Sequence, residues 1–404
     1  MPGPLRLTLL NQFYAPDASP TAQLAGSLAE HRAALGDDVT VITGRAGYLP
    51  GLARGKDGAD PSPTVRVHRV WVPAVGKSSV PRRLLGYVSF LVGSTVRVLR
   101  LPAQDVIVAM TTPPLLVVIA LLHRALHRGA RVVLWSMDCY PDAAERFGKL
   151  KEGGVLSCVL RWINRAAFRR LSDVVVLDGA MADLLASQYA AAPDQPQITV
   201  IPNWEPAQAF PPPGTVAPWP GFDALDVGDR IVVVYLGNAG IGHRFDTAVE
   251  AAAQLQDEAL FLFVGGGARR EELAELARRH DAANVVLQDY VPWDDVHAVM
   301  SGADGALITL DDRSLGIISP SKLHSNLAAG LPVLYVGPAG SNVDEAIEQF
   351  GCGSSLRNGD VAGLVAAVRA LRSDSGQRAR ARKAFESAYT DEVNLPRWDA
   401  LIDG

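Results

Sequence analysis

Short apolar runs alternate with longer segments of helical periodicity along almost the whole chain. The run at residues 5–10 precedes a helical segment at 21–35, and a second apolar run follows at 38–43. Short strands separated by helix-length segments favour parallel sheets with crossover helices. The same pattern predicts further strands at 65–72, 106–110, 131–135, 174–177 and 198–201.

A proline-rich segment interrupts this alternation at residues 206–220. Proline stiffens an extended connection, so we interpret the segment as a linker between domains. The alternation then restarts, with strands predicted at 231–236, 259–264, 284–287, 305–310 and 332–336. The predicted organisation is two doubly wound α/β domains at 1–205 and 221–384, the linker at 206–220, and a C-terminal segment at 385–404.

Composition supports two globular domains and narrows the classes of function. Of the 404 residues, 48% are hydrophobic and 20% are charged, which suits two cores and excludes a disordered chain. A net charge of −5 disfavours a general nucleic-acid-binding protein. The cysteines Cys139, Cys158 and Cys352 form no metal-binding or disulfide pattern, so we expect reduced thiols in the cytoplasm.

Neither a secretory signal nor a membrane-spanning helix is predicted. The run at 5–10 is too short for a signal sequence, and the longest apolar stretches, 84–101 and 115–126, are interrupted by arginine or histidine. Two segments, 81–100 and 161–170, combine arginines with bulky apolar residues. Such helices either expose a solvated cationic face or bind an anionic membrane surface, and the residues alone leave both interpretations open.

The first candidate site is a glycine-containing loop after the predicted strand at 231–236. Gly237, Gly240 and Gly242 would let backbone amides approach a diphosphate, and His243 and Arg244 would add positive charge. Their spacing is not the G-x-G-x-x-G of dehydrogenases. A tight structural turn explains the same glycines, so the loop by itself decides little.

The second candidate site is the segment from Ser319 to Gly330. Pro320 suits the first turn of a helix, Ser319 is placed to cap that helix, and Gly330 is placed to end it. Lys322 would then lie where free amides and the helix dipole favour an anion. The alternative is a well-capped helix with a solvated lysine.

Polar residues also follow two predicted strands of the first domain. Asp138 comes directly after the strand at 131–135, at the edge where parallel sheets bind ligands. It would face a ligand there or cap the next helix, a role that Asp142 would share. The loop at 11–17 follows the first strand, and its polar groups either line an acceptor pocket or form a turn.

Together these segments resemble the family-four retaining glycosyltransferases of the GT-B fold, over essentially the whole chain. The segment Tyr14-Ala15-Pro16-Asp17 is similar to the opening motif of that family. The most specific piece is Pro320-Ser321-Lys322-Leu323 with Ala328-Ala329-Gly330 after it. The segments at 111–115 and 135–142 are similar to bacterial members that build exopolysaccharide and O-antigen.

The resemblance implies two Rossmann-like domains facing each other across a cleft, and transfer of a sugar from a nucleoside-diphosphate donor with retention of configuration. UDP is the expected nucleotide, and neither a cofactor nor a metal is expected, because side-chain cations would neutralise the diphosphate. The acceptor would be a glycan or a lipid-linked glycan. The enzyme would be cytoplasmic and peripheral on the inner face of the cell membrane, with residues 385–402 packing back on the first domain.

The resemblance also assigns roles to single residues. Asp138, Lys322 and His243 would be catalytic, with Asp138 orienting the acceptor hydroxyl or accepting its proton. Tyr14 and Asp17 would bind the acceptor. The residues expected to bind the donor are Gly237, Asn238, Gly240, Gly242, Arg244, Tyr290, Val291, Ser321 and Ser325.

The chain departs from the family pattern at the donor site. The E-x7-E glutamates would fall at Ile317 and Ser325, and the usual arginine and lysine align with Asn238 and His243. The usual histidine of the first domain aligns near Met137, which leaves Asp138 as the polar group there. These departures indicate a divergent branch of the family.

Two other functions stay open on the sequence alone. A nucleotide-sugar 2-epimerase shares the fold, but its carboxylate-rich site is not evident here. A non-catalytic nucleotide-sugar-binding partner subunit would explain the missing glutamates. The retained Pro320-Ser321-Lys322 favours the transferase over that subunit.

Overall fold

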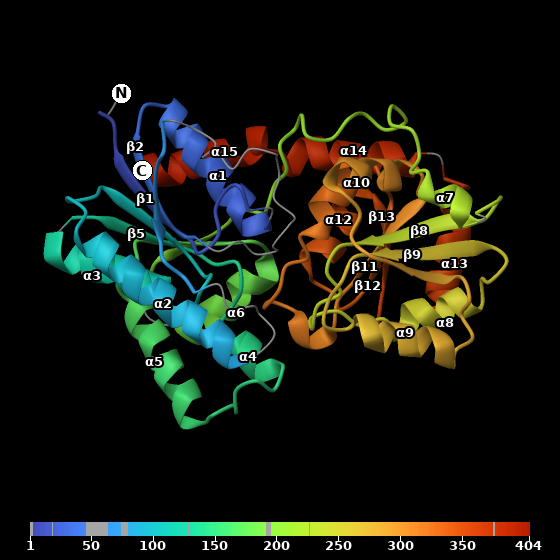
Figure 1. The fold of residues 1–404 in the computed structure, drawn as a ribbon, viewed down its shortest axis with the longest axis horizontal. Helices are drawn as coiled ribbons and strands as arrows, with labels where there is room; N and C mark the ends of the chain where they lie inside the picture. The colour runs from blue at the N-terminus through green and yellow to red at the C-terminus, as the bar shows by residue number, and fades with distance from the viewer. Residues whose placement is uncertain are drawn as a thin grey trace. The chain divides into compact units, whose positions relative to one another are not determined.

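The structure, a computed structural model, describes residues 3–17, 19–45, 64–73, 80–127, 129–190, 195–225, 227–374 and 376–404, without the side chains of 80–84, 293 and 294. The chain forms two compact units, each built on a parallel sheet (Figure 1). The first unit comprises Met1–Pro202 and Leu395–Gly404, and the second comprises Asn203–Asn394.

The first unit contains a seven-stranded sheet in the order β3-β2-β1-β4-β5-β6-β7. Helices α1 and α15 lie on one face of it, and α2, α3 and α5 lie on the other (Figure 1). Continuous apolar strands such as β4, which is buried throughout, suit a sheet covered on both faces. The elements are β1 (Arg6–Leu10), α1 (Pro20–Ala34), β2 (Asp38–Gly44), β3 (Arg66–Val70), α2 (Val80–Leu99), β4 (Val106–Met110), α3 (Leu116–His127), β5 (Arg131–Trp135), α4 (Asp142–Arg146), α5 (Val155–Phe168), β6 (Asp173–Val176), α6 (Gly179–Tyr189) and β7 (Gln197–Val200).

The end of the chain completes the first unit. Trp398 of α15 (Asp391–Asp403) is fully buried, and its ring centroid lies 4.5 Å from that of Trp135. The buried guanidinium of Arg32 pairs with Asp399 at 3.0 Å and with Asp403 at 2.7 Å. The division between the units falls at Leu395, inside α15, rather than at the predicted residue 385.

The second unit contains a six-stranded sheet in the order β10-β9-β8-β11-β12-β13. One apolar core joins the sheet to α10, α11, α12 and α14, and another joins its opposite face to α8, α9 and α13. The elements are α7 (Gly221–Ala224), β8 (Ile231–Leu236), α8 (Asp246–Ala253), β9 (Ala259–Val264), α9 (Arg270–Arg279), β10 (Val285–Gln288), α10 (Trp293–Ser301), β11 (Gly305–Thr309), η1 (Asp312–Ser314), α11 (Lys322–Ala328), β12 (Val333–Val336), α12 (Asn342–Phe350), β13 (Gly353–Leu356), α13 (Val361–Ala370) and α14 (Gln377–Ala388).

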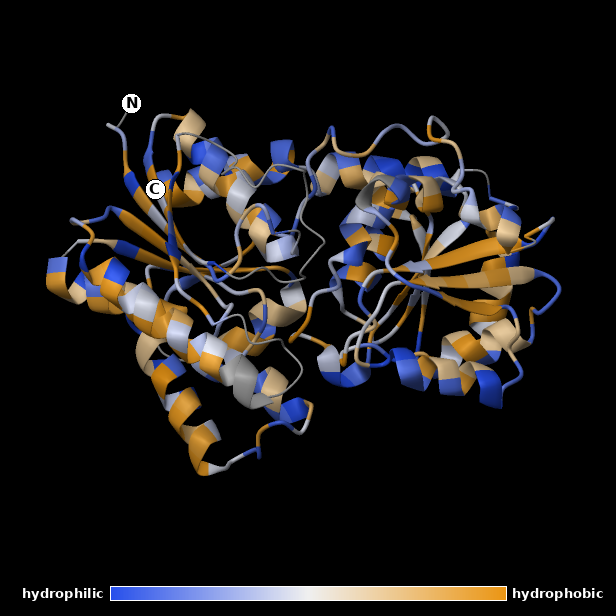
Figure 2. Cartoon of the chain, viewed as in Figure 1, coloured by the Kyte–Doolittle hydropathy of each residue, from blue (hydrophilic) through white to orange (hydrophobic). Residues whose placement is uncertain are grey.

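The prediction of two parallel α/β sheets is confirmed, and the strands of both sheets stand out as hydrophobic in Figure 2. The proline-rich segment belongs to the second unit. The guanidinium of Arg382 donates to the carbonyl of Phe210 at 3.3 Å, and the amide of Trp219 donates to the carbonyl of Ala298 at 3.1 Å. This segment is therefore attached along its length to the second unit.

Candidate functional site

Two glycine-containing loops meet at the carboxyl edge of the second sheet. They follow the neighbouring strands β8 and β9. The amide of Gly237 donates to the carbonyl of Val264 at 2.8 Å, and that of Ala239 donates to the carbonyl of Gly266 at 2.7 Å. Ligands of open parallel sheets bind at this edge, where glycine loops let phosphate oxygens approach backbone amides.

The second of these loops, residues 265–267, is a component that the sequence interpretation missed. Gly265 and Gly267 both have a φ of +134°. A Cβ at Gly265 would lie 2.4 Å from the carbonyl oxygen of Gly237, and one at Gly267 would lie 2.3 Å from that of Ala239. Both positions therefore require glycine. Three consecutive glycines directly after a strand were the signal in the sequence.

Lys322, at the start of α11, extends to the first glycine loop. Its ammonium donates to the carbonyl of Asn238 at 3.1 Å and lies 3.5 Å from Nε2 of His243. It also lies 4.8 Å from the ring centroid of Tyr235, within the range of a cation–π interaction. The fold thus brings together residues from two motifs that are separate in the sequence.

The surroundings of His243 keep its imidazole ring neutral. Nδ1 donates to the carbonyl of Thr309 at 2.6 Å, which leaves Nε2 as an acceptor facing Lys322. Burial, followed by the charge of Lys322, lowers the pKa of His243 to about 3, and burial lowers the pKa of Lys322 to about 8. Near pH 7 Lys322 is charged and His243 is neutral. His243 is a hydrogen-bond partner there and does not supply the positive charge expected from the sequence.

Two arginines of the second unit, Arg244 and Arg269, have roles that differ from those expected from the sequence. Arg244 is exposed and pairs with Asp246 at 2.8 Å. Arg269, which the sequence interpretation did not single out, is largely buried and lies 3.8 Å from Asp311. Its charge also contributes to the lowered pKa of His243, so Arg269 is a further cation in the surroundings of His243, although its guanidinium also pairs with Glu272 at 2.8 Å.

Other predicted donor-binding residues surround the same edge. The Tyr290 ring flanks Gly266, whereas Val291 is buried. The carbonyl of Gly242 accepts from the amide of Asp311 at 2.9 Å, and a Cβ at Gly242 would lie 2.6 Å from Ile318. Gly242 therefore also has the structural role of a tight turn. At Gly240 an added Cβ would meet only the Asn238 side chain closely, at 3.2 Å.

Helix α11 differs from its predicted start. The N-cap is Ser321, without a side-chain capping bond, and the hydroxyl of Ser319 is buried with no hydrogen-bond partner. The prediction that Ser319 caps this helix is wrong, because the regular helix begins only at Lys322. The Ser325 hydroxyl donates to the carbonyl of Lys322 at 3.3 Å. Gly330, with a φ of +68°, follows the helix as predicted.

At the carboxyl edge of the first sheet, Thr111 connects the loops that follow β4 and β5. Its hydroxyl oxygen accepts from the amides of Met137 at 3.0 Å and Asp138 at 3.1 Å. The loop after β1 joins them, because the amide of Gln12 donates to the carbonyl of Thr112 at 2.9 Å. These bonds hold the backbone of Asp138, and burial raises the pKa of its carboxyl group to about 6.

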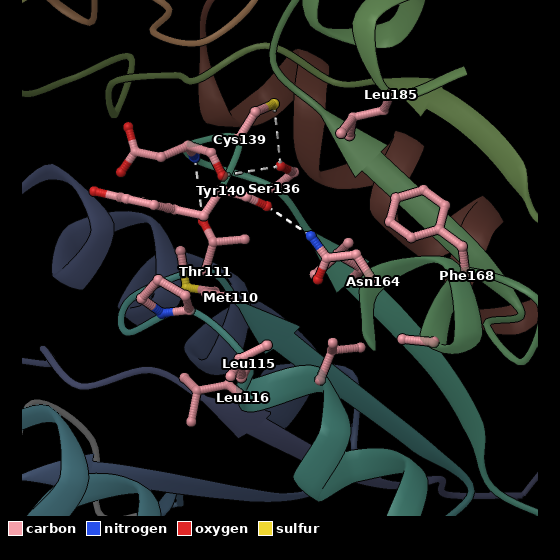
Figure 3. Close-up of a pocket in the computed structure, with 15 residues that line it drawn as sticks. Met110, Thr111, Leu115, Leu116, Ser136, Cys139, Tyr140, Asn164, Phe168 and Leu185 are labelled. Atoms are coloured by element: carbon pink, nitrogen blue, oxygen red, sulfur yellow. Dashed lines mark hydrogen bonds between the residues drawn. The ribbon is translucent and has the colours of Figure 1, made fainter. Parts of the chain in front are cut away.

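Asp138 is among the residues that line a cavity between this edge and α5. Figure 3 shows this cavity, with Thr111, Tyr140 and Asn164 around it. The side-chain amide of Asn164 donates to the carbonyl of Tyr140 at 2.6 Å and attaches α5 to the Asp138 loop. Helix α4 begins after Pro141, so Asp138 does not cap it. Asp142 is committed elsewhere, since its carboxylate accepts from Arg161 at 2.7 Å. A carboxyl group with a raised pKa beside a cavity has the properties of a general acid or base.

The two acceptor candidates lie in the loop after β1. Tyr14 is buried, and its carbonyl accepts from the amide of Asp17 at 3.1 Å. The carboxylate of Asp17 accepts from the amide of Ser19 at 2.7 Å. These contacts stabilise a turn in the way that aspartate commonly does.

Among the described residues, no group of three or more His, Cys, Asp or Glu side chains is arranged to hold a metal ion. In the same part of the chain, every helix is too short or too polar to cross a membrane. The side chains of 81–84, where the first basic segment begins, lie outside the described residues.

Comparison with known proteins identifies both units. Residues 21–204 match the glycosyl transferase 4-like domain, and residues 230–374 match the glycosyl transferases group 1. WbjE of Pseudomonas aeruginosa, named as a glycosyltransferase, is 24% identical over 303 residues, which is 74% of each chain. WcaI of Escherichia coli K12, named as a colanic acid biosynthesis glycosyl transferase, is 25% identical over 370 residues, covering 88% of this chain and 89% of WcaI.

Solved structures give the same result for the fold. Anabaena Alr3699/HepE, in complex with UDP and glucose, has a TM-score of 0.69 at 13% identity and covers 99% of this chain and 100% of its own. The two sheets and the domain matches define a glycosyltransferase of the GT-B fold. The chain combines a glycosyl transferase 4-like domain with a glycosyl transferases group 1 domain, and its bacterial relatives WbjE and WcaI are named as glycosyltransferases.

Proposed function

We propose that this glycosyltransferase transfers a sugar from a UDP-sugar to a hydroxyl of a glycan or lipid-linked acceptor, with retention of configuration and without a bound metal ion. One observation is the main support for the donor site. Nζ of the charged Lys322 lies 3.1 Å from the carbonyl oxygen of Asn238 and 3.5 Å from Nε2 of the neutral His243. UDP is supported by the Anabaena neighbour, which was solved with UDP and glucose.

The reaction breaks the bond between the anomeric carbon and the diphosphate oxygen, and the electron pair leaves with UDP. Lys322, Arg269 and the amides of the glycine loops stabilise that developing charge, a role that side-chain and backbone donors fill in other enzymes. The acceptor oxygen bonds to the anomeric carbon on the same face. Its proton passes to a base, for which Asp138 is our candidate in the first unit.

A thermal-shift panel of UDP-, GDP- and dTDP-sugars tests the donor site. A ligand that binds only the folded state stabilises it by an amount set by its concentration relative to Kd. We expect a shift with UDP-sugars that is lost in Lys322→Ala. A shift only with GDP- or dTDP-sugars would overturn the choice of UDP. A UDP shift without any transfer to acceptor would indicate a binding subunit instead of an enzyme.

We also propose that the enzyme works at the inner face of the cell membrane. Val155, Leu156 and Trp162 of α5 are exposed by 84%, 59% and 70%, and α5 contains arginines but no acidic residue. Exposed apolar side chains beside cations suit an anionic bilayer. We expect co-sedimentation with phosphatidylglycerol vesicles that weakens with salt, and no binding to such vesicles at low salt would overturn this location.

A further inference from the structure

A buried ion cluster adjoins the loop that carries Asp138. Nη2 of Arg161, in α5, donates to Oδ1 of Asp142 at 2.7 Å and also pairs with Glu145 of α4. The side chains of Arg161, Asp142 and Glu145 are exposed by only 19%, 4% and 4%. Charges remain buried in this way when they are paired, because an unpaired buried charge is costly. Arg161 is the first arginine of the basic segment at 161–170, but it belongs to this internal cluster and not to a cationic surface.

Helix α6 holds the carboxylate of Asp142 from its other side. The hydroxyl of Tyr189 donates to Oδ2 of Asp142 at 3.0 Å. Nη1 of Arg161 donates to Oε1 of Gln188 at 3.0 Å. The Tyr189 ring also packs on that of Phe168 in α5, with 5.1 Å between the ring centroids. Each oxygen of the Asp142 carboxylate therefore has its own donor, and the two donors come from two helices that pack on each other.

A second side chain of α5 holds the loop closer to Asp138. Asn164 lies three residues after Arg161 on the same face of the helix. Its side-chain amide donates to the carbonyl of Tyr140 at 2.6 Å (Figure 3). The hydroxyl oxygen of Thr111 accepts from the amide of Asp138 itself at 3.1 Å. The loop is therefore bound at Asp138 and again two residues later, which limits how far the Asp138 side chain moves.

We propose that Arg161 and Asn164 are positioning residues, through which α5 holds the Asp138 carboxyl group in place at the carboxyl edge of the first sheet. This inference rests on the proposed transferase function, in which Asp138 is the candidate base. A base must lie within hydrogen-bond reach of the proton that it accepts, so a small displacement of the loop lowers the rate. The rate then depends on two side chains of α5 that act through the loop.

Burial of the Asp138 carboxyl group gives a readout of the loop position. Burial raises the pKa of this group to about 6. A displaced loop admits water, which returns the pKa toward the ordinary value of about 4. The other titratable groups around the loop include Asp142 and Glu145 of α4, Arg161 of α5, Asp178 and Tyr189 at the two ends of α6, and Cys139. Replacing Asn164 changes none of these charges, so a shift in that variant reports the position of the loop.

NMR of the carboxyl carbons in the full-length protein, labelled at aspartate, follows this titration without substrate. The Asp138 resonance is the one that is missing from Asp138→Asn. We expect a pKa of about 6 in the wild type. In Asn164→Leu, which keeps the size of the side chain and removes the donor to Tyr140, we expect a pKa of about 5 or lower. Arg165→Gln is the matched control and should titrate as the wild type does, because Arg165 is the next residue of α5, is exposed, and donates to the Gln188 carbonyl at 3.4 Å.

The rate should follow the titration. We expect Asn164→Leu and Arg161→Gln to lower kcat by about 10- to 100-fold, as small misplacements of a reacting group do, and to keep the UDP-sugar thermal shift. Arg161→Lys retains a positive charge beside Asp142 and should recover part of the loss. If Arg161→Gln does not fold, because it leaves two buried carboxylates unpaired, Tyr189→Phe tests the same cluster. It removes one donor to Asp142 and keeps the ring.

A pKa of Asp138 that stays near the wild-type value in folded Asn164→Leu and Tyr189→Phe would overturn the proposal. A lowered pKa with an unchanged kcat would overturn it as well. So would an equal shift in Arg165→Gln, which would indicate general loosening of α5.

The same measurements separate this proposal from the proposed function. If Asn164→Leu lowers the pKa of Asp138 but the wild type transfers no sugar, α5 positions the carboxyl group and the transferase function fails. If the wild type transfers sugar and Asn164→Leu changes neither the pKa of Asp138 nor kcat, the positioning role fails and the transferase function stands.

Discussion

Nζ of Lys322 lies 3.5 Å from Nε2 of His243, although 79 residues separate them in the sequence. The relationship is directional, because His243 uses its other nitrogen to donate to the Thr309 carbonyl. A neutral imidazole therefore accepts from an ammonium group at the edge where parallel sheets bind ligands. His243 therefore positions Lys322, which is the only cation of the two.

Removing that cation should abolish most of the transfer activity. We expect Lys322→Ala to lower kcat by about 100- to 1,000-fold, the range found when one donor to a developing charge is removed. Initial rates with saturating UDP-sugar measure the effect. Lys383→Ala, an exposed lysine of the same unit, is the control and should retain the wild-type rate. Comparable loss in both variants would contradict a specific role for Lys322.

Donor binding should depend on pH through the same lysine. The pKa of Lys322 is about 8, so the charged form is lost as pH rises through 8, and UDP affinity should fall above that value. Bound diphosphate favours the ammonium form, so binding near pH 8 should take up a proton. Calorimetry in two buffers with different ionisation enthalpies measures this uptake. Lys322→Arg should bind UDP without proton uptake, and uptake that persists in it would assign the titration to another group.

The sequence predicts the strands and the two donor-site motifs because these depend on local patterns. Continuous apolar runs identify buried strands such as β4, whereas β13, Gly353-Ser354-Ser355-Leu356, has no such pattern and escapes prediction. Gly237 and Lys322 are recognisable from their place at a strand end and a helix start. The contact of Lys322 with His243 is not recognisable in this way, because it depends on how α11 packs against β11 and β12.

The charge state of His243 and the ion pair of Arg244 could not be predicted from the sequence for the same reason. His243 counts as a cation in a list of residues, yet burial and the neighbouring Lys322 lower its pKa to about 3. Arg244 looks well placed beside the glycine loop, but it pairs with Asp246 at 2.8 Å. Both outcomes are set by tertiary neighbours, which local sequence does not specify.

The second glycine loop should be as important for donor binding as the first. Gly265→Ala places a Cβ 2.4 Å from the Gly237 carbonyl, so we expect the first loop to shift and the UDP-sugar thermal shift to disappear. Gly214→Ala is the matched control, because Gly214 also has a positive φ, +82°, but an added Cβ there meets nothing within 4 Å. Loss of donor binding in both variants would show that backbone strain alone, and not the contact between the two glycine loops, weakens donor binding.

Asp138 should determine the acidic limb of the pH–rate profile. Its pKa is about 6, so the carboxylate is lost as pH falls through 6, and a rate that needs it as a base should fall with it. Asp138→Asn keeps the size of the side chain and removes the base. We expect kcat to drop by about 100-fold or more, as general-base catalysis commonly contributes that much.

The readouts for Asp138→Asn separate catalysis from folding and from donor binding. The UDP-sugar thermal shift should be unchanged, because the residue belongs to the first unit and the donor contacts belong to the second. Asp183→Asn, an exposed aspartate of α6, is the control and should keep both the rate and its acidic limb. If Asp138→Asn keeps an acidic limb near pH 6 and most of its rate, another group accepts the acceptor proton and Asp138 only holds the cavity in shape.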